Sequence, residues 1–126
     1  MKPRSSKEKG TRLEKFISKR LEEVLGSYGV KATRMPLSGA IDRFKSDIYT
    51  NLPISFECKN VERLDFREAW RQCTQDAGSK IPILATHRNN EKDILCLINF
   101  EDLLFFFELA LQTGWVSGIK KKTRSV

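Results

Sequence analysis

The sequence predicts a single α/β domain with the element order α-β-β-β-α-β-β-α. Segments 9–26 and 65–78 repeat apolar residues at three- and four-residue spacing, which is typical of amphipathic helices. Between them, residues 44–60 alternate apolar and polar side chains, as strands with one buried face do. Two short apolar runs and a third helical segment follow. A length of 126 residues suits one domain rather than two.

The N-terminal part predicts a tail followed by a helix. Residues 1–8 contain two serines and a proline and no apolar residue besides Met1, which favours a basic, disordered tail. A helix is expected from about Lys9 to Gly26. Glu14 lies beside its apolar stripe and, by position alone, is an ordinary solvated acid that complements the helix dipole. The stripe consists of Leu13, Phe16, Ile17, Leu21, Val24 and Leu25.

A first strand is expected over residues 28–36, where Val30, Ala32 and Arg34 alternate with polar residues. Residues 37–43 then form a loop, in which Ser38-Gly39 marks a turn. This region is locally basic through Arg34, Arg43 and Lys45.

Residues 44–60, FKSDIYTNLPISFECKN, predict a β-hairpin, because two alternating halves flank Asn51-Leu52-Pro53. In this hairpin Asp47 would lie opposite Glu57 or one place diagonal to it, with Lys59 beside them. Two carboxylates so placed could reach one hard divalent cation. The core-facing side would hold Phe44, Ile48, Ile54, Phe56 and Cys58, and the polar side Lys45, Asp47, Tyr49, Ser55, Glu57 and Lys59.

Asp65 is expected to cap the second helix, with Glu68 three residues later in a capping box and Gly78 at the end. The apolar runs 81–86 and 93–98 predict two buried strands. The buried stripe of the helix would be Phe66, Ala69, Trp70, Cys73 and Ala77.

Asn99 is expected to cap a third helix over residues 100–112, which Gly114 ends. This helix has almost no polar face and must therefore be covered on most sides. Either a central position in the domain or a homodimer contact would cover it. Residues 115–126 form a second basic tail.

The net charge of +7 is unevenly distributed. Residues 1–45 carry 12 Lys and Arg against 5 Asp and Glu, a surplus of 7, whereas residues 46–126 carry 11 of each. Such a field favours a polyanionic partner, and nucleic acid is the obvious candidate. A basic surface that only maintains solubility is the alternative.

The composition contains no membrane, secretory or zinc-binding signal. No apolar run approaches the length of a membrane span and the N-terminus is polar, so a cytoplasmic location is expected. Cys58, Cys73 and Cys96 lack the close pairing of a zinc site and are expected to be buried, reduced thiols. His87, the single histidine, is more simply a strand-end residue than a catalytic one.

Several short motifs follow one another over residues 9–100 in an order that resembles the PD-(D/E)XK nuclease superfamily. Within it the chain is most similar to the archaeal-type Holliday junction resolvases and their phage relatives. Ser46 stands where that family has a proline before the aspartate. The motifs are Lys9-Gly10 with Glu14 four residues after the glycine, Arg34 with Ser38-Gly39, Ser46-Asp47, Glu57-Cys58-Lys59, and Gln72 on the following helix.

The resemblance implies a restriction-endonuclease-like fold, a mixed sheet flanked by helices, with a nuclease domain at residues 9–114. Mg²⁺, or Mn²⁺ in its place, would be held by Asp47, Glu57 and the carbonyl of Cys58, with Glu14 completing the shell directly or through water. Lys59 would orient the attacking water or stabilise the pentavalent phosphate. Phosphate or water would be held by Ser38 and Gln72, and the DNA backbone by Arg12, Arg34, Arg43 and Lys45.

These observations predict a Mg²⁺-dependent DNA endonuclease, structure-selective, that resolves four-way junctions as a homodimer. Three alternatives stay open at this point. The chain could be a restriction- or repair-type nuclease of the same superfamily, or a catalytically inert DNA-binding module. The hairpin acids could also be solvated surface charges and the resemblance accidental.

Overall fold

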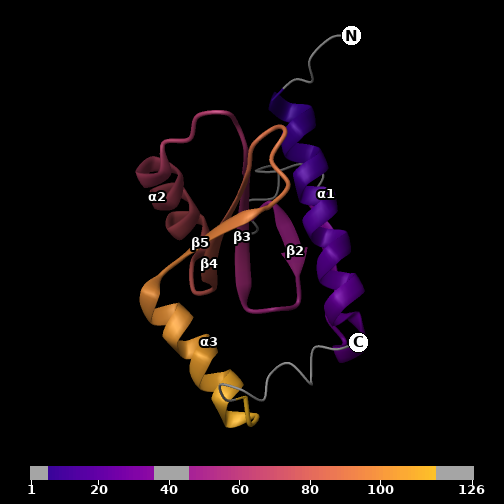
Figure 1. The fold of residues 1–126 in the computed structure, drawn as a ribbon, viewed down its shortest axis with the longest axis vertical. Helices are drawn as coiled ribbons and strands as arrows, with labels where there is room; N and C mark the ends of the chain where they lie inside the picture. Colours follow the sequence, from indigo (N-terminus) through magenta and orange to yellow (C-terminus); the bar gives the residue numbers. More distant parts are fainter. Residues whose placement is uncertain (1–5, 36–45, 116–126) are drawn as a thin grey trace.

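A computed structural model describes residues 6–35 and 46–115 of the chain (Figure 1). Within these ranges the element order is the predicted one, with a short 3-10 turn, η1, after the first helix. Figure 1 shows α1 and α2 on opposite sides of the strands, with α3 beyond the sheet. The elements are α1 Ser6–Leu25, η1 Gly26–Tyr28, β1 Ala32–Arg34, β2 Ile48–Thr50, β3 Ile54–Asn60, α2 Phe66–Ala77, β4 Ile81–His87, β5 Leu95–Ile98 and α3 Phe100–Gln112.

The main sheet is mixed and has the strand order β3-β4-β5. β3 and β4 are parallel, with Glu57 opposite Leu84 and Asn60 opposite His87, and α2 forms the crossover between them. β5 is antiparallel to β4. The expected α/β fold with a mixed sheet and flanking helices is therefore confirmed, and it is compatible with a restriction-endonuclease-like fold.

The predicted hairpin pairing is wrong, because β2 pairs with β1 in a separate antiparallel ladder rather than with β3. Asn51 explains this arrangement. Its side-chain oxygen accepts a hydrogen bond from the N–H of Lys31 at 2.9 Å, and its side-chain nitrogen donates to the carbonyl of Gly29 at 2.9 Å. These bonds tie the turn after β2 to the chain that leads into β1.

The hydrophobic core lies on both faces of β3 and β4. On one face Leu13 and Ile17 of α1, which are one helical turn apart, pack against Phe56. On the other face α2 packs on Leu84. The polar side predicted for β3 is consequently covered by α2, so its acid is buried rather than solvated. The α2 cluster comprises Ala69, Cys73 and Leu84, and the α1 cluster Leu13, Ile17, Ala32, Ile48, Phe56, Cys58 and Ala85.

The N-terminal boundaries differ from the predicted ones. α1 begins at Ser6, so residues 6–8 are helical and do not belong to the predicted tail, and Glu8 in the first turn suits the helix dipole. The first strand begins only at Ala32, because η1 ends at Gly29 with a φ of 87°. Of the other predicted loop and tail residues, 1–5, 36–45 and 116–126 lie outside the described residues.

α2 begins and ends as predicted. Asp65 is its N-cap and accepts a hydrogen bond from the N–H of Glu68 at 3.1 Å. The carboxylate of Glu68 does not close the capping box but pairs with Arg71 instead. Gly78 follows the helix with a φ of 60°, a conformation that favours glycine.

Part of the predicted core is exposed, on the helices and on the edge strand β5. β5 was expected to be buried, yet three of its four residues are exposed. The exposed residues that were expected in the core are Phe16, Val24, Phe66, Leu95, Cys96 and Leu97.

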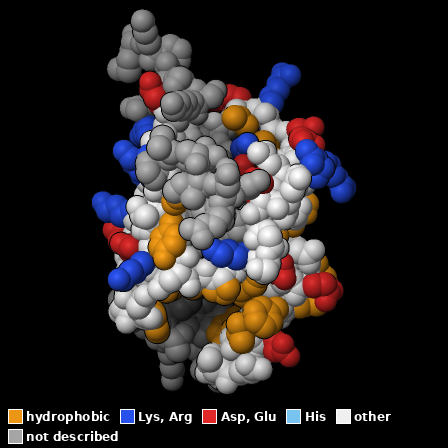
Figure 2. All heavy atoms as spheres, turned by 180° about the vertical axis from the view of Figure 1, so that it is seen from behind, with side chains coloured by type: hydrophobic (Ala, Val, Ile, Leu, Met, Phe, Trp, Pro, Cys, Tyr) orange, Lys and Arg blue, Asp and Glu red, His pale blue; other side chains and the backbone are white. Residues whose placement is uncertain are grey.

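α3 was expected either at the centre of the domain or in a dimer contact, and the central position is wrong. Asn99 caps it as predicted, accepting a hydrogen bond from the N–H of Glu101 at 2.8 Å, but none of its residues is buried. Figure 2 shows hydrophobic side chains gathered at the end of the molecule where α3 lies. Among the described helices, none is both long and apolar enough to cross a membrane.

Candidate active site

The acidic pair predicted at the centre of the chain is assembled, although not by a hairpin. Asp47 lies just before β2, and its N–H donates to the carbonyl of Phe56 on β3 at 3.1 Å. Its Oδ2 accepts a hydrogen bond from the N–H of Cys58 at 2.8 Å. Because Asp47 bonds the two residues that flank Glu57, both carboxylates lie next to each other, and both residues are buried.

Two further contacts fix Asp47 against its neighbours. The N–H of Met35 donates to its carbonyl at 2.9 Å. The buried hydroxyls of Ser46 and Ser55 are hydrogen-bonded to each other and join the segment before β2 to β3. Ser46 thus attaches the segment that holds Asp47 to β3 by a hydrogen bond, at the position where the resembling nucleases have a proline.

Glu57 carries a strongly perturbed carboxyl group. Burial and the neighbouring charges of Asp47 and, more weakly, Asp76 on α2 raise its pKa to about 7 against the opposing charge of Lys59. Lys59 Nζ lies 3.6 Å from Glu57 Oε2, and their side chains are 31% and 9% exposed. A buried acid beside a second acid is an arrangement that a cation would stabilise, and such perturbed groups are frequent at active sites.

Glu14 is not the solvated acid that its position in the helix suggested. It points from α1 towards β1, where Arg34 Nε donates to its Oε1 at 3.2 Å. Burial and the charge of Asp47 raise the pKa of Glu14, while Arg34 lowers it. Glu14 therefore lies within electrostatic range of the acidic pair, and Arg34 is its counterion as well as a predicted phosphate ligand.

The residues present fit a Mg²⁺ ion that keeps most of its waters. Among the described residues no group of three or more His, Cys, Asp and Glu side chains is arranged to hold a metal ion. Mg²⁺, however, is usually bound by one or two carboxylates together with water and substrate phosphates. Asp47 and Glu57 supply two adjacent carboxylates of this kind. At Cys58 the structure shows the N–H bonded to Asp47, and a role for its carbonyl stays a prediction.

The remaining predicted residues lie in three different situations. Ser38, Arg43 and Lys45 are outside the described residues. Arg12 is exposed on α1, and Gln72 is exposed on α2. Asp76, which the sequence analysis missed, lies one turn after Gln72 on the same helix face, and its charge acts on Glu57. The spacing of four residues from Gln72 was the signal that could have found it.

One comparison with known proteins gives a match. A family model described as "Phage putative PDDEXK endonuclease" matches residues 5–113. No curated protein matches the chain significantly. The matched span contains the acidic pair, Lys59 and Glu14.

Proposed function

Because the chain belongs to this family of phage PDDEXK endonucleases, we propose that it hydrolyses phosphodiester bonds of branched DNA with Mg²⁺, as a Holliday junction resolvase. The observation that carries the proposal is the buried pair Asp47 and Glu57, with Lys59 ion-paired to Glu57. An accidental set of solvated surface acids would not be buried together. The motif order from Lys9 to Gln72, which resembles that of the resolvases, supports the choice of substrate.

Asp47 and Glu57 would hold the metal, with Glu14 next to them. When bound there, Mg²⁺ supplies positive charge that lowers the pKa of water and stabilises the charge on the phosphate. Lys59 is less buried than Glu57, so its ammonium group can face the DNA while it stays close to the acids. We assign to Lys59 the orientation of the attacking water and the stabilisation of the negatively charged transition state.

DNA binding would rest on the positive charge of the N-terminal third of the chain. Residues 1–45 contribute the whole surplus of 7. Lysine and arginine contacts to phosphate position a duplex without reading its sequence. Affinity should therefore fall steeply as the salt concentration rises, and a salt-insensitive affinity would contradict this picture.

Incubation with labelled four-way junction, flap, linear duplex and single-stranded DNA, with and without Mg²⁺, tests the substrate. We expect metal-dependent, paired nicks near the centre of the four-way junction. Lys59→Ala should slow this cleavage by about 10²-fold or more, the usual contribution of a general acid or base. Lys80→Ala removes the same charge at the turn before β4 and serves as the matched control.

Two other results would replace the resolvase by one of the alternative functions. Cutting of linear duplex at fixed sequences would replace the resolvase by a restriction-type nuclease. Binding of all four substrates without cleavage of any, in Mg²⁺ or Mn²⁺, would identify a catalytically inert DNA-binding module.

We also propose that the protein is a homodimer joined through α3. Two nicks placed symmetrically about a junction require two active sites related by a twofold axis. α3 suits such a contact, because it has no buried residue and exposes a broad apolar surface. The exposed apolar residues of α3 are Phe100, Leu104, Phe105, Phe107, Leu109 and Leu111.

Phe105 and Leu109 are four residues apart and lie on one face of the helix. The double substitution Phe105→Glu and Leu109→Glu should convert the dimer to a monomer, because it places carboxylates in an apolar contact. Sedimentation equilibrium measures the mass, and Glu108→Gln on the same helix is the control. A wild-type protein that is monomeric at every concentration would contradict the proposal.

A further inference from the structure

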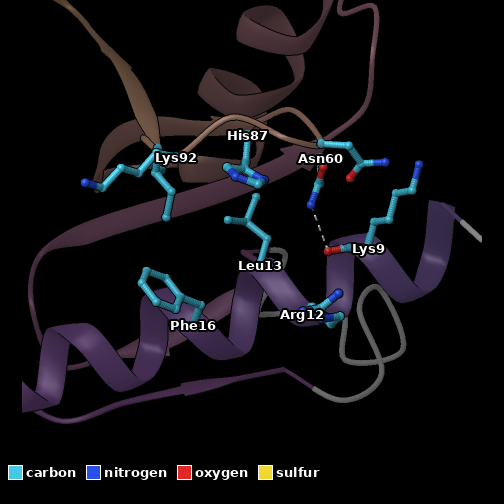
Figure 3. A pocket seen from close by; sticks show the side chains of 9 residues that line it. Lys9, Arg12, Leu13, Phe16, Asn60, His87 and Lys92 are labelled. Atoms are coloured by element: carbon cyan, nitrogen blue, oxygen red, sulfur yellow. Dashed lines mark hydrogen bonds between the residues drawn. The ribbon is translucent and has the colours of Figure 1, made fainter. Parts of the chain in front are cut away.

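A cavity of about 240 Å³ opens on the α1 side of the sheet (Figure 3). In Figure 3 His87 lies above Leu13, Phe16 and Arg12 of α1, with Lys92 at one end of the cavity and Lys9 at the other. The cavity lies where the parallel strands β3 and β4 end, at Asn60 and His87. No residue of the candidate metal pair lines it.

Residues that line the cavity are adjacent in sequence to residues of the acidic site. Asn60, which lines it, directly follows Lys59, and Leu13, which also lines it, directly precedes Glu14. Successive Cα atoms are about 3.8 Å apart. The cavity and the acidic site are therefore neighbours along both β3 and α1.

The polar part of the lining fits a phosphate. Three cationic side chains, those of Lys9, Arg12 and Lys92, surround the cavity, and none of the described residues that line it is an acid. His87, which also lines the cavity, has its Nε2 2.7 Å from the backbone oxygen of Glu91, so this contact involves the main chain of Glu91 and not its carboxylate. This charge distribution favours a monoanionic or dianionic group over a neutral or cationic ligand.

The remaining part of the lining fits a nucleobase. Leu13, Phe16 and Ile94 supply apolar surface, and the side chain of Phe16 is exposed although it is aromatic, the residue being 57% accessible. Asn60 Nδ2 donates to the carbonyl of Lys9 at 3.4 Å, while its buried Oδ1 has no hydrogen-bond partner among the described residues. The exposed ring of Phe16 beside these residues is a surface on which a base could stack.

From this combination we propose that the cavity binds one unpaired nucleotide of the DNA substrate, with the base on Phe16 and the phosphates on either side of it at the cations of the rim. The proposal rests on the proposed nuclease function and deepens it. Unstacked bases are recognised on aromatic side chains beside positively charged grooves, and a branch point exposes such bases more readily than intact duplex does. The cavity is smaller than the roughly 300–1,000 Å³ typical of sites for drug-sized ligands, which suits a single base.

Fluorescence anisotropy with the full chain in EDTA tests the proposal, because binding is then measured without cleavage. The probes are a labelled oligothymidylate, a duplex of equal length and, as a competitor, free deoxythymidine monophosphate. Phe16→Ala should weaken binding of the oligothymidylate by about 5- to 150-fold, the effect of losing one stacked base, and leave duplex binding unchanged. Phe16→Trp should retain it.

Phe66→Ala is the matched control, because Phe66 is 51% exposed but lies on α2, outside the cavity. Lys92→Ala should reduce the slope of log affinity against log salt concentration by about 1, because one phosphate contact is lost. Lys80→Ala, at the opposite end of β4, should leave binding at the cavity unchanged. Circular dichroism confirms that each variant is folded.

Three results would overturn the proposal. Equal losses for Phe16→Ala and Phe66→Ala would show that the cavity does not bind a base. Competition by the free mononucleotide at the affinity of the oligonucleotide would assign the cavity to a free nucleotide instead of a DNA strand. A Phe16→Ala variant that binds the oligothymidylate normally and cuts junctions normally would reject the cavity and leave the nuclease function intact. If the protein never cuts DNA but Phe16→Ala loses binding of the single strand, the nuclease function is rejected and the cavity proposal is retained.

Discussion

Asp47→Asn is expected to reduce DNA cleavage by about 10³-fold while DNA affinity and the free energy of unfolding stay close to the wild-type values. The substitution removes the negative charge that would hold the metal, a loss comparable to that of a main electrostatic contributor to a transition state. The asparagine keeps a side-chain oxygen that can accept the hydrogen bond from Cys58 N–H, which Asp47 accepts at 2.8 Å. Single-turnover cleavage of a four-way junction and anisotropy in EDTA measure the two effects separately.

The comparison with Asp47→Ala separates chemistry from structure. Asp47→Ala should reduce cleavage to the same extent as Asp47→Asn. It would also leave the N–H of Cys58 buried without a partner, which costs roughly 1–3 kcal/mol of stability. Asp93→Asn, at an exposed acid before β5, is the control for the loss of one charge. Normal cleavage by Asp47→Asn would show that the acidic pair is not the active site.

Glu57→Gln is expected to make the metal-free protein more stable at about pH 8 and to flatten its stability between about pH 4.5 and 7. Burial and Asp47 raise the pKa of Glu57 from 4.5 to about 7 in the folded state. Between these values the folded protein binds more protons than the unfolded chain, so wild-type stability falls as the pH rises. The shift corresponds to roughly 3 kcal/mol, fully lost above the folded pKa.

Chemical denaturation in EDTA at several pH values measures this difference between Glu57→Gln and the wild type. Glu14, whose pKa is also raised, is present in both proteins, so its contribution largely cancels in the comparison. Added Mg²⁺ should stabilise the wild type at about pH 8 more than at about pH 5, because the site then holds two ionised acids, and should stabilise Glu57→Gln less. Identical pH profiles for the two proteins would contradict both the burial of an ionisable Glu57 and its role in the metal site.

Local patterns predicted the helices and their ends well. Asp65 and Asn99 cap helices as expected, because capping depends on the bonds between a side chain and backbone N–H groups two or three residues away. The α/β order of elements follows from periodicity in the same way. The acid-and-lysine motif of β3 was likewise readable, since Glu57 and Lys59 are separated by two positions on one strand and form an ion pair.

The pairing of the strands and the burial of their faces could not be predicted from the sequence, because both depend on residues that are distant in the chain. The alternation of residues 44–60 is equally consistent with a hairpin and with the observed arrangement, in which Asn51 ties the turn to Gly29 and Lys31. The same alternation predicted an open polar face on β3, but α2 covers it. Exposure of β5 and α3 similarly follows from what is packed on them and not from their composition.

The sequence by itself determined the kind of chemistry, since acids and a lysine at these spacings resemble one nuclease superfamily and the family match agrees with it. Only the tertiary structure decided how those residues are arranged. It buries Glu57 beside Asp47, gives Glu14 the counterion Arg34, and places Phe16 and Asn60 around one cavity. Each of these outcomes depends on burial and on charges brought together across the fold, and such effects have no local signature in the chain.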